Sequence, residues 1–303
     1  MEGTVTDNIS DIKLNRIGIE RKYDSTGDLA VDSLVRDMYI KKKYCLVPKS
    51  AEEARAKGLK FFNGMISSVP RLNIYSDRNR TTVCADVAPA RYMLGQAMRD
   101  VVDEGRFKDK TIQKMSPRLL NVSLLVPVKR NNKYYLLSQI KGHTFNSGKI
   151  IAALVAGNVD AKYLSDTNPL KLALSKECME EIGANLNDID HTPFSYLLDE
   201  TKTGHINFAS VSRGVDLDKF LDIYESQTKA KLFKDKKREV TGLSLLPIGG
   251  SDRSSGYVDC FFPTESGLVE KKEHRDFCLY TRLLVDYLSK QKNAESLLKT
   301  AGF

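Results

Sequence analysis

Residues 169–182 form the segment that most constrains the fold, because they fit one amphipathic helix with defined ends. Thr167 or Asn168 suits the N-cap position, Pro169 suits the first helical position, and Gly183 is a typical residue for ending a helix. Apolar residues recur at every fourth position, which places them on one face. That face consists of Leu170, Leu174, Cys178 and Ile182. The sequence therefore predicts a helix with one apolar face here.

Three glutamates, Glu177, Glu180 and Glu181, lie at the C-terminal end of this helix. Residues three and four apart on a helix are neighbours, so the carboxylate of Glu177 is repelled by both of the others. The negative end of the helix dipole adds a further penalty. A bound divalent cation would reverse the sign of both terms, and clustered carboxylates are the hard oxygen ligands that magnesium prefers. The pattern indicates a metal site, and an exposed helix that is acidic by chance is the alternative.

Strand patterns flank the helix on both sides. Residues 119–130 and 134–140 are rich in leucine, valine and tyrosine, and the intervening "NNK" predicts a hairpin turn. An amphipathic helix is expected over 273–291. Further strands are expected over 148–159, 195–200, 204–213 and 240–248.

In residues 1–117 the apolar residues mostly recur at helical spacing, so this region is predicted to be mainly helical, with one short strand over 81–87. The helices are expected over 28–44, 51–66 and 88–105. We therefore expect an α+β fold with two parts. A mainly helical N-terminal region covers 1–117, and a second domain covers 118–303.

Residues 176–184, "KECMEEIGA", resemble the second half of the Nudix box of the MutT-like hydrolases, whose pattern is G-x5-E-x7-R-E-U-x-E-E-x-G-U with U an aliphatic residue. The fixed glutamates and glycine of that half match Glu177, Glu180, Glu181 and Gly183. Gly157 matches the first glycine of the box, and the predicted hairpin resembles the strands before it. The resemblance covers roughly residues 118–290 and extends to a subgroup of bacterial and phage MutT-like proteins predicted to be phosphoesterases.

The chain departs from this pattern in three places. Lys176 stands where the family has an arginine, whose fork of donors a lysine ammonium cannot reproduce. Gly157 and Lys176 are 19 positions apart, five more than in the pattern. The first glutamate of the box has no clear match, and Asp160 or Asp166 is the candidate substitute. These departures motivate an alternative function, a Nudix-fold protein that binds a nucleotide or RNA with weak or no catalysis.

The resemblance implies a Nudix-type α/β/α sandwich with a mixed sheet. It also implies a metal-dependent hydrolase that cleaves the pyrophosphate bond of a nucleoside diphosphate linked to another group, so the expected substrate is a small molecule derived from a nucleotide. The expected cofactor is Mg²⁺ or Mn²⁺, held by the carbonyl oxygen of Gly157 and by the carboxylates of Glu177, Glu180 and Glu181.

The resemblance also assigns catalytic roles to single residues. Glu177 and Glu180 are expected to act in catalysis, with Lys176 orienting a glutamate. Glu239 is the candidate for a further carboxylate from the far side of the fold, and Asp252 comes next.

Substrate phosphates need cations, which the predicted hairpin and its flank can supply. The candidate substrate-binding residues are Lys129, Arg130 and Lys141. Alternatively, all three are ordinary basic side chains that lie exposed at strand ends and bind no substrate.

The composition limits the class of partner and the compartment. The net charge of +8 weakly favours anionic partners, with a solvated basic surface as the alternative. The five cysteines and four histidines lack metal-ligand spacing, which predicts free thiols and a metal held by oxygen.

The chain has no apolar run of membrane-spanning length and no apolar signal core at its start, so we expect a cytoplasmic protein without membrane contact. Homo-oligomerisation, substrate gating or binding of a separate partner is assigned to the N-terminal region.

Overall fold

The computed structural model describes residues 3–17, 29–57, 64–77, 80–104, 118–141, 150–200, 205–232, 240–249, 257–264, 266–274 and 276–303. These residues contain seven α-helices and a mixed sheet, which confirms the α+β class. The chain forms two compact units. Unit 1 comprises 1–121, 158–173 and 199–207, and unit 2 comprises 122–157, 174–198 and 208–303.

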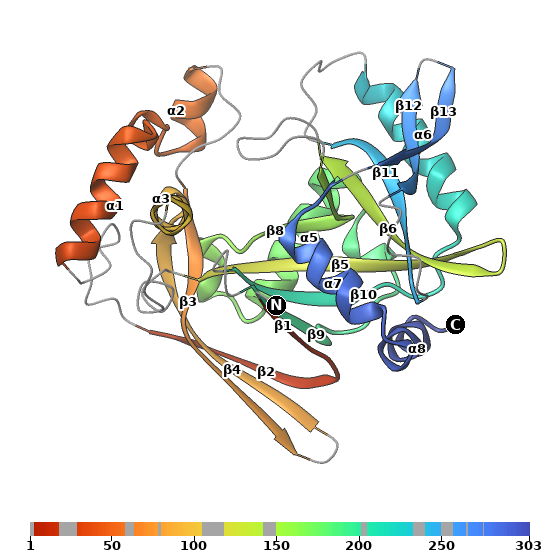
Figure 1. Ribbon diagram of the computed structural model, residues 1–303, viewed down its shortest axis with the longest axis horizontal. Coiled ribbons are helices and arrows are strands. Elements are labelled where there is room, and N and C mark those ends of the chain that lie inside the picture. Colours follow the sequence, from red (N-terminus) through yellow and green to blue (C-terminus); the bar gives the residue numbers. More distant parts are fainter. Residues whose placement is uncertain are drawn as a thin grey trace. The chain divides into compact units, whose positions relative to one another are not determined.

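Unit 1 contains long strands that the sequence did not predict. β2 (Ile9–Arg16) runs parallel to β4 (Arg80–Arg91), and β3 (Met65–Asp77) runs antiparallel to β4 on its other side. The short β1 (Thr4–Thr6) precedes them. Figure 1 shows the three longer strands side by side, running away from the helices of this unit. The prediction of a mainly helical N-terminal region is therefore wrong.

Strand pairing overrides the local helical pattern at two places in unit 1. The expected helix over 51–66 is reduced to α2 (Ala51–Ala56), and Met65 and Ile66 pair with β4 instead. The expected helix over 88–105 begins only at α3 (Tyr92–Asp103), and Pro89 lies within β4 opposite Ser67. Side chains that alternate along β4 are buried, as in a strand, so long-range packing decides the conformation.

The helices of unit 1 have a small core of their own. α1 (Leu29–Lys41), the 3₁₀ turn η1 (Tyr44–Leu46) and α3 bury one cluster of apolar side chains. The buried cluster consists of Val31, Val35, Met38, Tyr44, Val47, Met93, Leu94, Ala97, Met98 and Val101. α1 agrees with the helix expected over 28–44.

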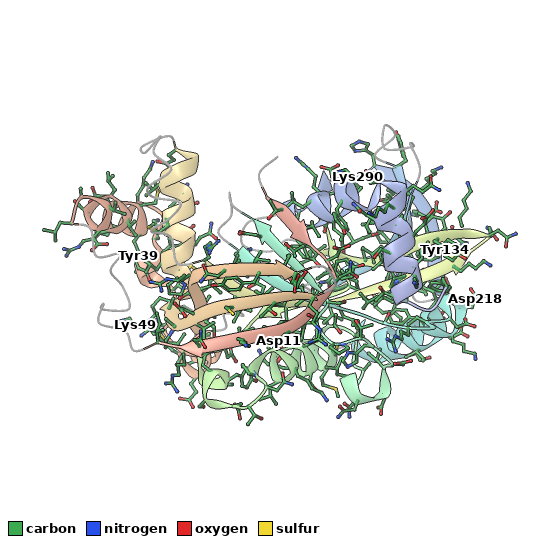
Figure 2. The ribbon with its side chains drawn as sticks, turned by 90° about the horizontal axis from the view of Figure 1, so that it is seen from below. Asp11, Tyr39, Lys49, Tyr134, Asp218 and Lys290 are labelled. Carbon is green, nitrogen blue, oxygen red and sulfur yellow. The ribbon has the colours of Figure 1, made fainter. Side chains whose placement is uncertain are left out.

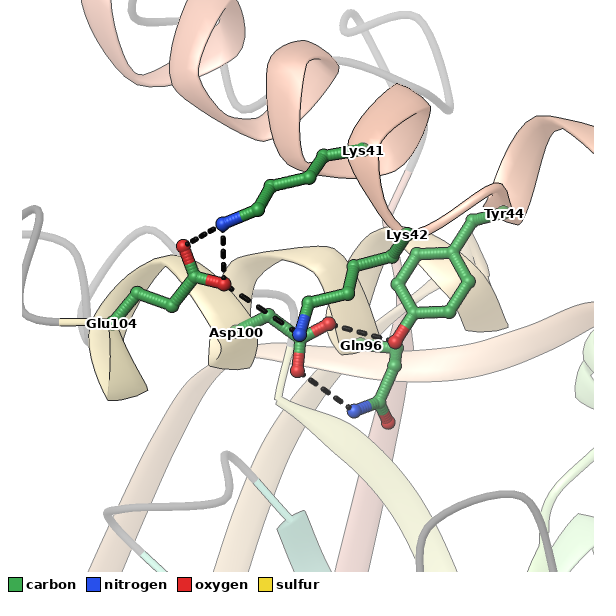
Figure 3. Close-up of polar contacts among 6 residues, drawn as sticks. All are labelled: Lys41, Lys42, Tyr44, Gln96, Asp100 and Glu104. Atoms are coloured by element: carbon green, nitrogen blue, oxygen red, sulfur yellow. Dashed lines mark hydrogen bonds and ion pairs between the residues drawn. The ribbon is translucent and has the colours of Figure 1, made fainter.

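Polar contacts at the rim of this core tie α1 and η1 to α3, as Figure 3 shows. The hydroxyl of Tyr44 donates to Asp100 Oδ2 at 2.7 Å. Lys41 Nζ donates to both carboxylate oxygens of Glu104, at 2.9 and 2.7 Å, and Lys42 Nζ lies 3.5 Å from the same carboxylate. The hydrogen bond from Lys41 lowers the pKa of Glu104.

The predicted hairpin is present at the centre of the sheet in unit 2. β5 (Leu119–Arg130) pairs antiparallel with β6 (Lys133–Lys141), and Asn131 and Asn132 have φ values of 50° and 59°. Two consecutive left-handed residues match the tight turn that suits a twisted hairpin, and asparagine tolerates this conformation. The prediction of this hairpin from "NNK" is confirmed.

The sheet continues outward from β6 in antiparallel order through β11 (Val240–Pro247), β12 (Tyr257–Thr264) and β13 (Gly267–His274). β7 (Ile150–Ala153) also pairs with β6, and β14 (Asp276–Phe277) runs parallel to β7. The expected strand over 240–248 is confirmed, and β12 and β13 were not predicted.

Five elements contribute residues to both units. They are β5, β8 (Val155–Asn158), α5 (Pro169–Glu181), β9 (Tyr196–Glu200) and β10 (His205–Val211). The remaining helices are α6 (Leu217–Leu232), α7 (Leu279–Leu288) and α8 (Gln291–Thr300), with 3₁₀ turns η2 (Ala161–Ser165) and η3 (Leu186–Asp188). The expected C-terminal helix over 273–291 is shorter, because its first residues belong to β13 and β14.

α5 has the ends and the apolar face that the sequence predicts. Asn168 Oδ1 accepts from the N–H of Lys171 at 3.2 Å, so Asn168 caps the helix. Gly183 has a φ of 68°, and the N–H of Ala184 donates to the carbonyl of Cys178 at 3.3 Å, which closes the last turn. All four residues of the predicted apolar face are buried.

Two further observations concern the chain as a whole. Cys84, Cys178, Cys260 and Cys278 are free thiols, as expected. Within the described ranges, no helix has the length and hydropathy needed to cross a membrane.

Candidate metal centre

Gly157 and Glu177 are in direct contact, although they are separated by 19 residues of chain. A β-carbon built on Gly157 would lie closer than 3.0 Å to the carboxyl carbon and to both carboxylate oxygens of Glu177. Only glycine fits beneath this carboxylate without displacing it. The first glycine of the proposed box therefore lies against its first matched glutamate.

Glu181 is held by donors from two strands. The backbone N–H of Ala156 in β8 donates to Glu181 Oε2 at 2.8 Å. Gln139 Nε2 and Lys141 Nζ, both from β6, donate to Glu181 Oε1 at 3.0 and 3.3 Å. These contacts fix the C-terminal turn of α5 against β6 and β8, and they orient the carboxylate.

Lys176 lies between the other two glutamates. Its Nζ is 3.6 Å from Glu177 Oε1 and 3.7 Å from Glu180 Oε2. The side chain of Glu177 is 13% exposed and that of Glu180 is 59% exposed, so the cluster has one enclosed and one open carboxylate. The ammonium of Lys176 thus faces both carboxylates as one point charge rather than as a fork of donors.

Burial and like charge raise the pKa of Glu177 to about 7. Loss of solvent is the largest cause; Lys176 opposes it, and Glu181 and Glu180 add to it. The protonated and ionised forms of this carboxyl are therefore close in free energy near neutral pH. Burial also raises the pKa of the Cys178 thiol to about 12, which makes that thiol unreactive.

The donors present fit a hard divalent cation in kind. Carboxylate oxygens predominate, and the buried Gln139 Oε1 atom has no hydrogen-bond partner among the described residues. Among the described residues, no three His, Cys, Asp or Glu side chains already converge as a ligand set. The two lysines instead neutralise the glutamates in the present arrangement. We call Glu177, Glu180 and Glu181 the acidic cluster. Its oxygen atoms are of the kind that bind a hard divalent cation, but they are not arranged as a ligand set among the described residues.

Of the three expected substrate cations, the structure brings only Lys141 to the acidic cluster. Arg130 Nη1 and Nη2 bind the carboxylate of Glu270 at 2.6 and 2.7 Å, and Lys129 Nζ lies 5.8 Å above the ring of Tyr134. Lys129 and Arg130 flank the hairpin turn, and Lys141 ends β6 eight residues beyond Lys133, which is roughly 26 Å along a strand. Figures 1 and 2 show this turn, near Tyr134, at the outer end of the hairpin.

Glu239 and Asp252 are outside the described residues, so their roles stay predictions. Asp160 Oδ2 lies 3.3 Å from Lys162, and Asp166 follows directly after η2.

Sequence reasoning missed two groups of the site, Gln139 and the backbone N–H of Ala156. Gln139 carried a signal, since it is a polar residue inside an apolar strand pattern. The Ala156 N–H carried none, because every residue other than proline has this group.

Solved structures match this chain, whereas family models and curated sequences do not. No family model matches the chain, and no curated protein matches its sequence. DR0079 from Deinococcus radiodurans aligns with 32% of this chain and 57% of its own, at 13% identity and a TM-score of 0.26. A MutT/nudix family protein from Enterococcus faecalis aligns with 59% of this chain and 67% of its own, at 10% identity and a TM-score of 0.30. The chain thus spans little more than half the length of the first protein.

Proposed function

We propose that this protein is a metal-dependent Nudix-type hydrolase that cleaves the pyrophosphate bond of a nucleoside diphosphate linked to another group. The contact between Gly157 and Glu177 is the observation that supports this function most directly. In the sequence, only the proposed box links these two residues. In the fold they are in contact, although the segment between Gly157 and Lys176 is five residues longer than in the box pattern. The neighbouring hydrogen bond from the Ala156 N–H to Glu181 likewise holds a second glutamate of the proposed box against β8.

Mg²⁺ or Mn²⁺ would be held by the carboxylates of the acidic cluster and by the carbonyl oxygen of Gly157. When bound, such an ion neutralises phosphate charge and activates water. Burial raises the pKa of Glu177 to about 7 in the metal-free protein, so binding of the ion near neutral pH would be coupled to loss of the Glu177 proton. Lys141 would exchange its contact with Glu181 for a phosphate oxygen, and Lys176 would keep Glu177 and Glu180 in position.

The test is a substrate panel with Mg²⁺ or Mn²⁺, read by the mass of the products. ADP-ribose, dinucleoside polyphosphates, NAD(H) and capped RNA cover the main linkages. A nucleoside monophosphate should be released from at least one of them, and Glu181→Gln should abolish that release. Glu270→Gln is the matched control, because Glu270 pairs with Arg130 at the hairpin turn. Absence of product from the whole panel would reject the hydrolase.

A second function, nucleotide or RNA binding with weak or no catalysis, is favoured by the two lysines. Lys141 and Lys176 already neutralise the acidic cluster, so the carboxylates are satisfied without an ion. Binding to RNA would weaken steeply with salt, because phosphate contacts release counterions. Salt-dependent affinity without turnover on the panel would support this function, and no affinity at low salt would exclude its RNA version.

A further inference from the structure

The outer edge of β3 in unit 1 is open along half of the strand. β3 pairs with β4 on one side along its length. On the other side, its partners among the described residues all lie at the start of the strand. Ile66 bridges to Asp160, the Ser67 N–H donates to the carbonyl of Val159, Ser68 pairs with Leu119, and the Val69 N–H donates to the carbonyl of Arg118. Residues 71–77, "RLNIYSD", have no strand beyond them in the part of the chain that is described. We call these residues the β3 edge.

The β3 edge carries apolar side chains in solvent. Ile74 is 40% exposed and Tyr75 is 60% exposed. An open edge with exposed apolar side chains is a template for pairing with another strand. Figure 2 shows the strands of this sheet side by side, with Asp11 on β2 at the opposite edge.

Two features limit the length of strand that can pair. Pro70 precedes the β3 edge and has no N–H to donate, so pairing cannot continue through it in that direction. Asp77 is the last residue of β3 and pairs with Arg80 at the start of β4, so the chain turns there. The available window is the seven residues from Arg71 to Asp77, and its midpoint is Ile74.

A second copy of this window fits the first with complementary charge. If two copies pair antiparallel over the whole window, Ile74 lies opposite Ile74 of the second copy, and Arg71 lies opposite Asp77 at both ends. Opposite charges directly across two strands are stabilising. The Arg71 side chain is 74% exposed, and its Nε is 3.7 Å from Asp86 Oδ2, which leaves other guanidinium donors for a second carboxylate.

Backbone hydrogen bonding permits this register. In an antiparallel sheet, alternate residues of an edge strand direct both N–H and C=O outward. When Ile74 lies opposite Ile74 of the second copy, even-numbered residues face even-numbered residues and odd-numbered residues face odd-numbered ones. The N–H and C=O groups that point away from β4 in one copy therefore meet those that point away from β4 in the other copy. Ile74 and Leu72 also share a face with their partners Val83 and Ala85, so pairing would extend one apolar face across both copies.

We propose that the protein forms a two-fold symmetric dimer by antiparallel pairing of the β3 edge with the same edge of a second copy. This proposal gives the N-terminal region a specific role in self-association and rests on no residue of the acidic cluster. A seven-residue interface is small, so the dimer is concentration-dependent.

Charge reversal tests both the interface and its register. Arg71→Asp places two like charges at each end of the pair, and so does Asp77→Arg. In sedimentation velocity, wild type should shift from monomer to dimer with concentration, each variant alone should stay monomeric, and their equimolar mixture should dimerise again. Circular dichroism spectra that match wild type would show that the variants fold.

Crosslinking tests the position of the two-fold axis. Ile74→Cys should form a disulfide-linked dimer on mild oxidation, since the two sulfurs would face each other. Ser76→Cys is the control, because two such residues would be about 13 Å apart in this register. Wild type, oxidised in parallel, reports any linkage through the native cysteines. A wild-type protein that stays monomeric to its solubility limit, or charge-reversed variants that still dimerise alone, would overturn the proposal.

Discussion

Gly157 lies directly beneath the carboxylate of Glu177, and this contact joins β8 to the C-terminal half of α5. It explains why a glycine is needed at this position, since a methyl group there would have to push the carboxylate away. The contact also makes position 157 a sensitive probe of the proposed metal centre.

Gly157→Ala should displace Glu177 and weaken binding of Mn²⁺. We expect a loss of about 1–3 kcal/mol in the free energy of unfolding, as for other overpacked sites. Urea unfolding with and without Mn²⁺ measures both effects. Gly95→Ala is the control, because the atoms nearest to its new methyl belong to the flexible side chain of Leu119, the first of them at 3.3 Å. An unchanged Mn²⁺ effect in Gly157→Ala would contradict the role assigned to this contact.

The metal-free protein should lose stability as the pH rises through about 7. The pKa of Glu177 is raised in the folded state from 4.5 to about 7, so the folded state binds the proton more tightly than the unfolded state. This contribution is fully present below pH 4.5 and is lost as Glu177 ionises near pH 7, with an upper limit of about 3 kcal/mol.

Urea unfolding between pH 5 and 8 measures this slope, and Glu177→Gln should flatten it. Mn²⁺ should restore stability at pH 8 in wild type but much less in Glu177→Gln. An equal pH slope in the two proteins would show that another group titrates.

Gln139→Ala should weaken Mn²⁺ binding by roughly 10- to 100-fold, because it removes a donor that orients Glu181. The free Mn²⁺ signal in electron paramagnetic resonance measures this affinity without any substrate. Ser138→Ala is the matched control on the same strand, since the Ser138 hydroxyl makes a long hydrogen bond to the carbonyl of Leu136, at 3.5 Å, and does not contact Glu181 among the described contacts. Equal losses in both variants would indicate a general effect on β6.

Lys176→Arg should raise kcat/KM on whichever substrate the panel identifies. An arginine fork can bind Glu177 and Glu180 at once, whereas the lysine ammonium lies 3.6 and 3.7 Å from them. Lys176→Met should lower kcat/KM by removing the charge. Steady-state kinetics with Mg²⁺ measures both, and an arginine variant as slow as the methionine variant would contradict the positioning role.

Tyr44→Phe should destabilise the helices of unit 1 by about 1–2 kcal/mol, because it removes the hydrogen bond to Asp100. Thermal unfolding measures the loss. Tyr257→Phe is the control, since Tyr257 is largely exposed on β12. The two variants should differ clearly if the contact in Figure 3 stabilises the fold.

Local interactions made several elements predictable from sequence. The ends of α5 depend on residues within a few positions of Asn168 and Gly183, and the hairpin turn depends on Asn131 and Asn132. The acidic cluster was predictable for the same reason, because helical spacing alone makes its members neighbours.

Strand pairing made other elements unpredictable. The residues that became the first part of β3 had helical spacing, and only their pairing with β4 decided their conformation. The same holds for Pro89, which was expected near a helix start and lies in β4.

Residue spacing within one segment was enough to predict α5 and the three carboxylates at its end. The contacts made by these and other side chains follow from the fold instead. Gln139, Lys141 and the Ala156 N–H donate to Glu181, and Arg130 pairs with Glu270 at the hairpin turn. The physical reason is separation along the chain. Contacts across 25 to 140 residues depend on how strands and helices pack, which spacing within one segment does not encode.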